Sequence, residues 1–300
     1  MKVRELALAA RESSRALASA STADKNAVLL ELARLIEAHR AEILVANAAD
    51  MEEARGAGLS ESKLKRLALS ASAVEQLAVG IRQVAELPDP VGAITRDSTV
   101  PSGLRVRKVR IPLGVIAMIY EARPGVTVDA FSLCFKAGNA CLLKGGREAS
   151  RSNAVLLELA QRALRSRRLP PASVSLITTS DREEIKELIS LTGVIDLVIP
   201  RGGVELIRFV AQHAKVPTIQ HFQGICHVYV DRAADLEKAL RVCVTAKTSA
   251  PAACNAAECL LIHRAIAGAF VPGLGEALHA AGVELRGDRE ICALTPRAVP

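Results

Sequence analysis

One cysteine in the segment Thr248–Glu258 is the residue best suited to covalent chemistry. Cys254 stands between a turn led by Pro251 and a run of residues with high helix propensity, Ala256-Ala257-Glu258. A helix N-terminus carries unpaired N–H groups and a partial positive charge, which favour the thiolate, the form that attacks carbonyl carbon. The pattern predicts that Cys254 is a nucleophile. The alternative, for any cysteine considered alone, is a small buried apolar residue.

Two other segments combine cations with glycines directly after apolar, strand-like runs. Glycines let the backbone approach a pyrophosphate, and a helix that follows them directs its N–H groups at the anion. Considered alone, the same residues are typical of a strand end that faces solvent and of an ordinary tight turn. The residues concerned are Lys144, Gly145 and Arg147 in the first segment and Arg201, Gly202 and Gly203 in the second.

Four segments, in this order along the chain, closely resemble the gamma-glutamyl phosphate reductases. This family, also called the glutamate-5-semialdehyde dehydrogenases, is part of the aldehyde dehydrogenase superfamily. The segments are Pro112–Pro124, Lys136–Glu148, Gly224–Asp231 and Thr248–Glu258. The resemblance implies an α/β fold with a parallel-sheet cofactor-binding domain over residues 1–220 and an incomplete α/β catalytic domain over residues 221–300.

The resemblance also implies a reaction, the NADPH-dependent reduction of L-glutamate 5-phosphate to L-glutamate 5-semialdehyde in proline biosynthesis. Cys254 would attack the γ-carbonyl carbon and release phosphate, and the resulting thioester would be reduced to the aldehyde. Asn255 and the backbone N–H of Cys254 would donate to the developing oxyanion. Arg123 would pair with the phosphate or carboxylate of the substrate. Asn255 fits a helix cap equally well, and Arg123 also fits a structural salt bridge.

The expected cofactor is NADPH or NADP, although the chain lacks the G-x-G-x-x-G spacing of many dinucleotide sites. The superfamily instead uses a lysine at the end of one strand and the start of a helix after another. Lys144 matches the first position and Arg201–Gly203 the second. Lys144 and Arg147 could also neutralise the ribose phosphate that distinguishes NADP from NAD. The stretch His221–Gly224 lacks the glutamate that activates water in hydrolytic relatives, which argues against a general aldehyde oxidiser.

Composition excludes several other classes of protein. Half of the 300 residues are hydrophobic and 24% are charged, as expected for a globular chain of two domains. Basic residues are scattered despite the net charge of +7, and aromatic residues make up only 2%, so a nucleic-acid partner is not expected. No apolar run approaches the ~20 residues of a membrane span, which favours a cytoplasmic protein. Seven cysteines without a C-x-x-C pair indicate neither a zinc site nor a disulfide framework.

The elements expected from periodicity fall into two regions. The first ninety residues are expected to be helical, with Asp24 as the N-cap of a helix whose apolar positions extend from Val28 to Leu44. A basic, exposed strand arm over about 97–111 follows, and we expect it to pair with another subunit of a homo-oligomer. His227 is interpreted as a core histidine of a strand. Strands alternating with helices predict parallel sheets covered on both faces, with strands near 114–119, 140–143, 174–178, 195–199, 227–231, 259–262 and 283–286.

Members of the resembled family continue well beyond the position of Pro300. Their additional segment normally completes the catalytic domain. Two hypotheses therefore follow from the sequence. The chain is a reductase, or it is a truncated, inactive or partner-dependent relative of the reductase.

Overall fold

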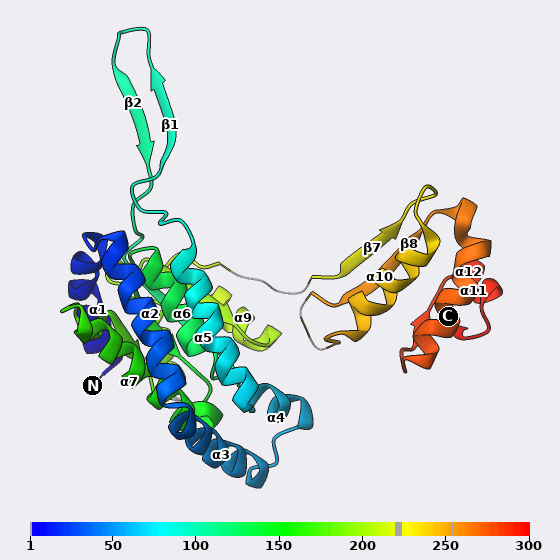
Figure 1. Cartoon of the computed structure of the whole chain (residues 1–300), viewed down its shortest axis with the longest axis horizontal. Coiled ribbons are helices and arrows are strands. Elements are labelled where there is room, and N and C mark those ends of the chain that lie inside the picture. Colours follow the sequence, from blue (N-terminus) through cyan, green and yellow to red (C-terminus); the bar gives the residue numbers. More distant parts are fainter. Residues whose placement is uncertain (1, 180, 220–223, 252, 254) are drawn as a thin grey trace. The chain divides into compact units, whose positions relative to one another are not determined.

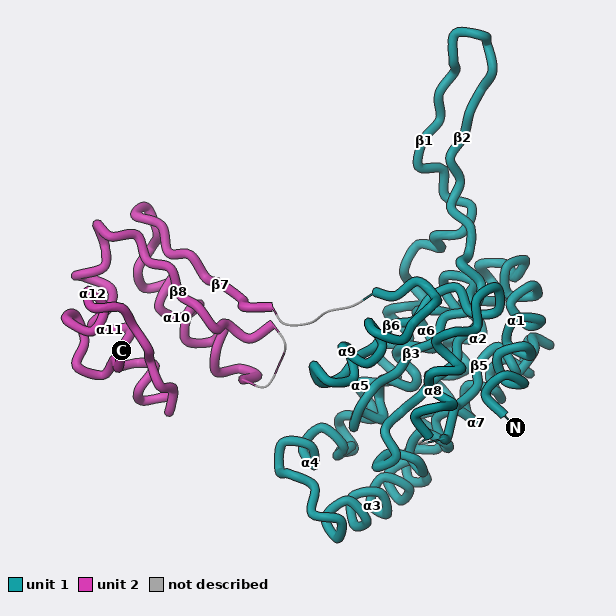
Figure 2. The backbone as a smooth tube through the Cα atoms, turned by 180° about the vertical axis from the view of Figure 1, so that it is seen from behind, with its two compact units in different colours: residues 1–222 teal, residues 223–300 magenta. Residues whose placement is uncertain are grey.

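The computed structural model describes residues 2–179, 181–219, 224–251, 253 and 255–300. Two compact units make up the chain, residues 1–222 and residues 223–300 (Figure 2). Within the described residues, no helix is both long enough and apolar enough to cross a membrane.

The first unit is built around a parallel sheet of four strands, as the sequence predicted, and Figure 1 shows the helices of this unit. The strands lie in the order β5-β4-β3-β6, so the chain adds strands on one side of β3 and then returns to its other side. Consecutive residues of β3 and β4 are buried, because helices cover both faces of the sheet. The strands are β3 (Val115–Tyr120), β4 (Ala140–Lys144), β5 (Val174–Leu176) and β6 (Leu197–Arg201).

Nine α-helices surround this sheet in the described part of the first unit. Helix α1 packs on β3, β4 and β5, α6 packs on β3 and β4, and α2 and α5 form an outer layer against α6. The first ninety residues are helical, as predicted. The helices are α1 (Val3–Ala18), α2 (Thr22–Ala38), α3 (Arg40–Gly56), α4 (Glu61–Leu67), α5 (Ala71–Glu86), α6 (Val126–Lys136), α7 (Ser150–Ser166), α8 (Arg182–Leu188) and α9 (Val204–His213), with short 3₁₀ turns η1 (Arg147–Ala149) and η2 (Pro171–Ser173).

The region expected to be one helix from Val28 to Leu44 is two helices, so that prediction was wrong. The chain leaves helical geometry at His39, and α3 begins at the next residue. The predicted N-cap was also wrong. The Ser21 side chain accepts the backbone N–H of Asp24 at 3.1 Å, and the Ser21 hydroxyl donates to the Asp24 carboxylate at 2.6 Å. Ser21 therefore caps α2, and Asp24 lies in its first turn.

The expected strand arm is an antiparallel hairpin of β1 (Ile94–Thr99) and β2 (Arg105–Val109). Every residue of β2 is exposed. Arg105 donates two hydrogen bonds to Asp97 across the hairpin, at 2.9 and 2.6 Å. These cross-strand bonds and the backbone ladder hold the hairpin, since neither strand packs a face on the core.

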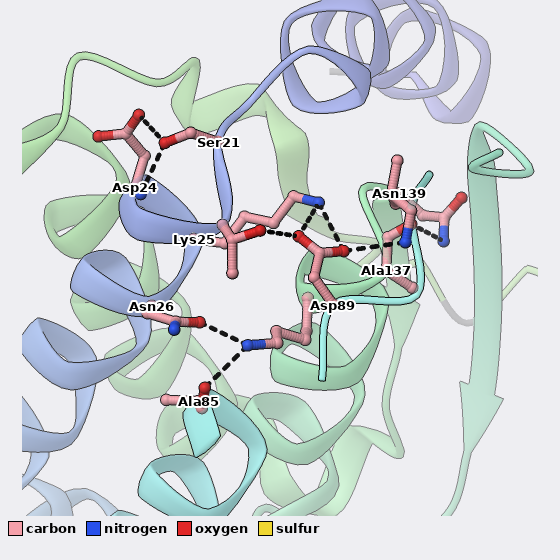
Figure 3. A network of polar contacts seen from close by, with 11 residues as sticks. Ser21, Asp24, Lys25, Asn26, Ala85, Asp89, Ala137 and Asn139 are labelled. Carbon is pink, nitrogen blue, oxygen red and sulfur yellow. Dashed lines mark hydrogen bonds and ion pairs between the residues drawn. The ribbon is translucent and has the colours of Figure 1, made fainter. Parts of the chain in front are cut away.

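A buried polar network joins α2 to the segment that leads into the arm. Lys25 is 1% exposed, and its ammonium group donates to both oxygens of Asp89 at 3.2 and 2.9 Å (Figure 3). Asp89 also accepts from the backbone N–H of Val91 at 3.0 Å. Nearby, Lys136 donates to the Ala85 carbonyl at 2.8 Å. The network therefore ties the start of the arm to the helices beneath it.

The second unit contains two short parallel strand pairs, β7 with β8 and β9 with β10. Its buried core is small, comprising Val230, Cys243, Phe270, Leu274 and Leu278. A cavity of about 310 Å³ lies between β8, α11 and β9. The elements are β7 (Cys226–Val230), α10 (Leu236–Thr248), β8 (Ala257–Ile262), α11 (Arg264–Ala280), β9 (Leu285–Arg286), α12 (Arg289–Leu294) and β10 (Ala298–Val299).

Candidate active site

The carboxyl ends of β3, β4 and β6 meet at one edge of the central sheet. Register places Ile119 beside Lys144 and Tyr120 beside Arg201, so the loops that follow the three strands are neighbours. The strand order reverses between β3 and β6. In open parallel sheets, ligands bind in the crevice outside the carboxyl ends of the strands at such a point. The topology therefore identifies the loops after these strands as the candidate site of the first unit.

The loop after β4 carries two of the predicted cofactor cations. Lys144 is half-buried, and its ammonium group donates to the Gly145 carbonyl at 2.8 Å. Burial lowers the pKa of Lys144, while the negative charge of Glu148 acts in the opposite direction. Arg147 is exposed, and its guanidinium group makes no hydrogen bond or ion pair with any residue that the structure describes. A ligand anion can therefore reach the Arg147 guanidinium without displacing an internal partner.

Gly145 is required by packing. A Cβ at this position would lie 2.3 Å from the Asn153 amide nitrogen and 3.2 Å from the Tyr120 ring. Asn153 is itself held by Thr127, whose hydroxyl donates to it at 2.9 Å and lies 2.8 Å from the Tyr120 hydroxyl. Burial raises the pKa of Tyr120, so the phenol stays neutral. The glycine lets the loop lie directly on this buried group.

The N-terminus of α7, which follows the same loop, is already occupied. The buried carboxylate of Asp50, from α3, accepts from the Ser152 backbone N–H at 2.8 Å and from the Ser152 hydroxyl at 2.7 Å. It also accepts the Arg151 backbone N–H at 3.2 Å. An internal side chain thus satisfies the first-turn donors, and α7 is not an anion site.

The loop after β6 leads into α9 and carries the second predicted cofactor segment. Arg201 is exposed, and its side chain has no hydrogen bond or ion pair among the described residues. The Gly203 backbone N–H donates to a carboxylate oxygen of Glu121 at 3.2 Å. A Cβ on Gly202 would lie 2.8 Å from the same carboxyl group. Glu121, which the sequence did not identify, therefore lies at the predicted anion-binding end of α9.

The loop after β3 contains the predicted substrate residue. Arg123 is exposed and makes no ion pair with any described residue, so the salt-bridge interpretation receives no support there. Its neighbour Ala122 is buried at 3% exposure and has a φ of 28°. The Ala122 backbone N–H donates to Glu148 at 2.8 Å. The loop that carries Arg123 is thereby joined to the loop after β4.

Cys254 lies outside the described residues. The elements on either side of it differ from the expected turn followed by a helix. Helix α10 ends at Thr248, Asn255 is an exposed turn residue, and strand β8 begins at Ala257. No helix begins after Asn255, so its interpretation as a helix cap and the expected helix after Cys254 were wrong. Pairing of β8 with β7 overrides the helix propensity of the alanines. The oxyanion role of Asn255 stays a prediction.

His227 also differs from its predicted role. It lies on β7 but is exposed, and its Nδ1 is 2.7 Å from the Ile225 carbonyl. The core interpretation was therefore wrong, because this side of β7 is not covered within the second unit. Among the described residues, no cluster of three or more histidine, cysteine or acidic side chains could hold a metal ion.

The arrangement of cations fits a dinucleotide. Lys144, Arg147 and Arg201 lie on adjacent loops, and none of them makes an ion pair with a described residue. A Cβ on Gly203 would have no neighbour closer than 3.8 Å, so a ligand can approach this backbone. The site thus offers positive charge to phosphate, and the backbone at Gly203 is open to approach although its N–H group donates to Glu121.

Comparison with known proteins defines the class. Residues 1–296 match the aldehyde dehydrogenase family. The chain is 49% identical over 297 residues to the gamma-glutamyl phosphate reductase of Xylella fastidiosa strain 9a5c, which covers 99% of this chain and 72% of that relative. The crystal structure of gamma-glutamyl phosphate reductase from Thermotoga maritima matches with a TM-score of 0.92 at 41% identity, over 100% of this chain and 72% of that one.

A second crystal structure, gamma-glutamyl phosphate reductase from Saccharomyces cerevisiae, matches with a TM-score of 0.68 at 30% identity, over 100% of this chain and 79% of that chain. The chain belongs to the gamma-glutamyl phosphate reductase family of the aldehyde dehydrogenases. It is an oxidoreductase with the aldehyde dehydrogenase-like α/β fold that the sequence predicted.

Proposed function

We propose that the chain reduces L-glutamate 5-phosphate to L-glutamate 5-semialdehyde with NADPH, releasing phosphate, as a step of proline biosynthesis. The observation that carries this proposal is the meeting of three cation-bearing loops at the edge of the sheet where its strand order reverses. Both the cofactor and the acyl phosphate carry several negative charges. Exposed arginines on these loops are suited to phosphate because they can donate two parallel hydrogen bonds.

The cofactor would be held by residues of two loops. Lys144, Gly145 and Arg147 would bind the ribose and its phosphate, and Arg201, Gly202 and Gly203 would bind the pyrophosphate at the start of α9. When bound, the cofactor supplies a hydride. The Gly203 N–H donates to the Glu121 carboxylate. This carboxylate would have to move aside for the N–H to donate to a phosphate oxygen instead. The first unit would thus act as the cofactor-binding domain.

The covalent step is assigned to the second unit. The Cys254 thiolate would form a bond to the γ-carbonyl carbon, and the bond from this carbon to the phosphate oxygen would break. The backbone N–H of Cys254 and the Asn255 amide would donate to the oxyanion. Arg123 would pair with the phosphate or the carboxylate of the substrate. The substrate is a small molecule. The chain would act in the cytoplasm as a homo-oligomer whose subunits pair through the β1–β2 hairpin.

Replacing the nucleophile tests this function. Cys254→Ala should abolish phosphate-dependent oxidation of the semialdehyde, the reverse assay, because no other thiol replaces the attacking atom. The dissociation constant for NADPH, measured by fluorescence titration, should stay nearly unchanged. Cys292→Ala is the matched control, since Cys292 is a half-buried thiol of α12, and it should retain turnover. Turnover by Cys254→Ala would refute the assignment.

A second candidate is a partner-dependent relative that binds cofactor but does not turn over alone. It is favoured by the small core of the second unit and by the cavity of about 310 Å³ beside β8. The two candidates differ in one measurement. Turnover by the chain alone supports the reductase, whereas NADPH binding without turnover supports the partner-dependent form.

A further inference from the structure

Glu148 joins two loops of the candidate site, and neither proposed binding function uses it. It lies in the 3₁₀ turn η1 directly after the cofactor residue Arg147. Its Oε1 accepts the backbone N–H of Ala122 at 2.8 Å. Ala122 precedes Arg123, the residue assigned to the substrate. The contact therefore runs from the cofactor loop to the substrate loop.

The backbone at Ala122 is in a conformation that needs support. Its φ of 28° lies in the left-handed region, which residues with a Cβ rarely adopt. Such conformations persist where surrounding contacts determine them, and they concentrate at functional sites. Ala122 is 3% exposed, so water does not replace a lost partner of its N–H group. The Glu148 carboxylate is thus the acceptor that fixes this peptide.

Gly146 leaves room for the Glu148 side chain to fold back toward the preceding residues. A Cβ on Gly146 would lie 2.2 Å from Glu148 Oε1 and 2.5 Å from its carboxyl carbon. The φ of Gly146 is −63°, an ordinary value, so backbone freedom does not explain this glycine. The explanation is space, because the folded-back carboxylate occupies the volume that a side chain would fill.

Resting on the proposed function, we propose that Glu148 is a positioning residue. Through the Ala122 backbone it orients Arg123 toward the anionic group of the acyl phosphate. A charged acceptor forms a stronger hydrogen bond than a neutral one, so the Glu148 carboxylate restricts the peptide of the buried Ala122. Arg123 is the next residue, so its starting position depends on this peptide. Loss of the carboxylate should then weaken handling of the substrate and leave handling of the cofactor largely intact.

Five variants test the proposal in the reverse assay, two of them being Arg123→Ala and its combination with Glu148→Ala. Glu148→Ala should raise the KM for semialdehyde and phosphate about tenfold or more, as expected for a lost hydrogen bond to a charged group, with less than a threefold change in the Kd for NADPH. Glu148→Gln keeps an oxygen that can accept from Ala122 and should recover most of the loss. Added to Arg123→Ala, Glu148→Ala should have little further effect, because both changes remove the same interaction. Glu158→Ala, on the exposed face of α7, is the control and should change neither constant.

Additive effects of Glu148→Ala and Arg123→Ala, or a rise confined to the Kd for NADPH, would overturn the positioning role. Hydrogen exchange at the Ala122 amide gives a readout that does not require turnover. Glu148→Ala should accelerate this exchange, Glu148→Gln should do so much less, and unchanged exchange in both would overturn the proposal. If the wild-type chain shows no turnover while Glu148→Ala accelerates exchange, the proposed function fails and the contact stands. The two failures are therefore distinguishable.

Discussion

Lys144 and Arg123 illustrate how exposure changes the chemistry of a cation at the residue scale. Arg123 is exposed, so water solvates its guanidinium group. Lys144 is half-buried, and this burial lowers the pKa of its ammonium group. A partly desolvated ammonium binds phosphate more strongly than an exposed one, but it titrates earlier. The Lys144 ammonium should therefore lose its charge at lower pH than an ordinary lysine.

Lys144→Ala should weaken NADPH binding about tenfold or more and NADH binding much less, since a charge-assisted contact contributes roughly 1.5–3 kcal/mol. In the unmodified chain, the preference for NADPH should decline as pH rises through the lowered pKa of Lys144. This decline should come at lower pH than for an ordinary lysine, because only the protonated amine pairs with phosphate. Fluorescence titrations of both cofactors across this pH range measure the effect.

Lys186→Ala is the control for this substitution. Lys186 is a lysine of α8 whose ion pair with Glu183 lies at the surface, and its loss should alter neither affinity. Equal losses for NADPH and NADH in Lys144→Ala would remove any role for Lys144 in recognising the ribose phosphate.

Selective alkylation tests the nucleophile without turnover. Cys134 and Cys141 are buried, and their mutual hydrogen bond together with burial raises the pKa of Cys141 well above its ordinary value. The Cys141 thiol should stay protonated near neutral pH, and burial should keep reagents from both thiols. Iodoacetamide at limiting concentration should label Cys254 first, as read by peptide mass spectrometry. Labelling of Cys134 or Cys141 ahead of Cys254 would contradict the assignment.

The sequence identified the cations of the site but missed the acidic residues between them. Lys144 and Arg201 end apolar runs, which is a local signal. Glu121 and Glu148 act on the backbone N–H groups of Gly203 and Ala122, and each contact depends on which loops the strand register brings together. Nothing in the local pattern around either glutamate specifies its partner.

At the element scale, helix propensity gave the wrong structure where strand pairing decided it, at the start of β8. A strand was predicted near 259–262, but Ala257 and Glu258, which favour helix, also belong to β8 because this strand pairs with β7. The strands of the first unit were predictable, since continuous apolar runs bounded by glycine or proline mark buried parallel strands. The cap of α7 was not, because its acceptor Asp50 comes from a helix about a hundred residues earlier.

Asp89→Ala should cost about 3–5 kcal/mol of unfolding free energy, because it leaves the Lys25 ammonium buried without its carboxylate. Burial raises the pKa of Asp89, but hydrogen bonds from Lys25, Val91 and Thr22 outweigh this and hold it below its ordinary value. The contribution is therefore present above the pKa of an unfolded aspartate and is lost as pH falls through the lowered pKa. Urea denaturation at neutral and acid pH measures both effects.

Two comparisons separate this buried pair from ordinary ion pairs. Glu31→Ala removes the surface partner of Arg34 and should cost no more than about 1 kcal/mol. Adding Lys25→Met to Asp89→Ala removes the unpaired charge and should restore part of the stability. A loss for Asp89→Ala no larger than for Glu31→Ala would show that the network does not stabilise the helices.

For the whole molecule, the two units differ in how much apolar surface they bury. The core cluster of the first unit extends from Val3 to Val216, whereas that of the second unit has five buried hydrophobic residues among those that the structure describes. Each fully buried large side chain contributes roughly 1.5–3 kcal/mol, while ordering costs about 1–2 kcal/mol for every residue. The second unit should therefore open at lower free energy than the first.

Limited proteolysis of the chain should cut preferentially after residue 224 and leave a resistant N-terminal fragment. Mass spectrometry of the fragments identifies the cut positions. NADPH should further protect the first unit, because a ligand that binds only the folded state stabilises it. Uniform resistance of both units, together with full turnover, would show that the second unit is stable and competent as it stands.

The hairpin of β1 and β2 has a consequence for assembly that follows from mass action. A two-stranded hairpin with no packed face is marginally stable in water, and β2 is exposed at every residue. If a second copy of the chain supplies the missing strand neighbour, ordering of the hairpin and association become one equilibrium. Amide protection in residues 94–109 would then increase with protein concentration, while protection of the central sheet would not. Amide protection of the hairpin would thus measure the fraction of chains that are associated with a second copy.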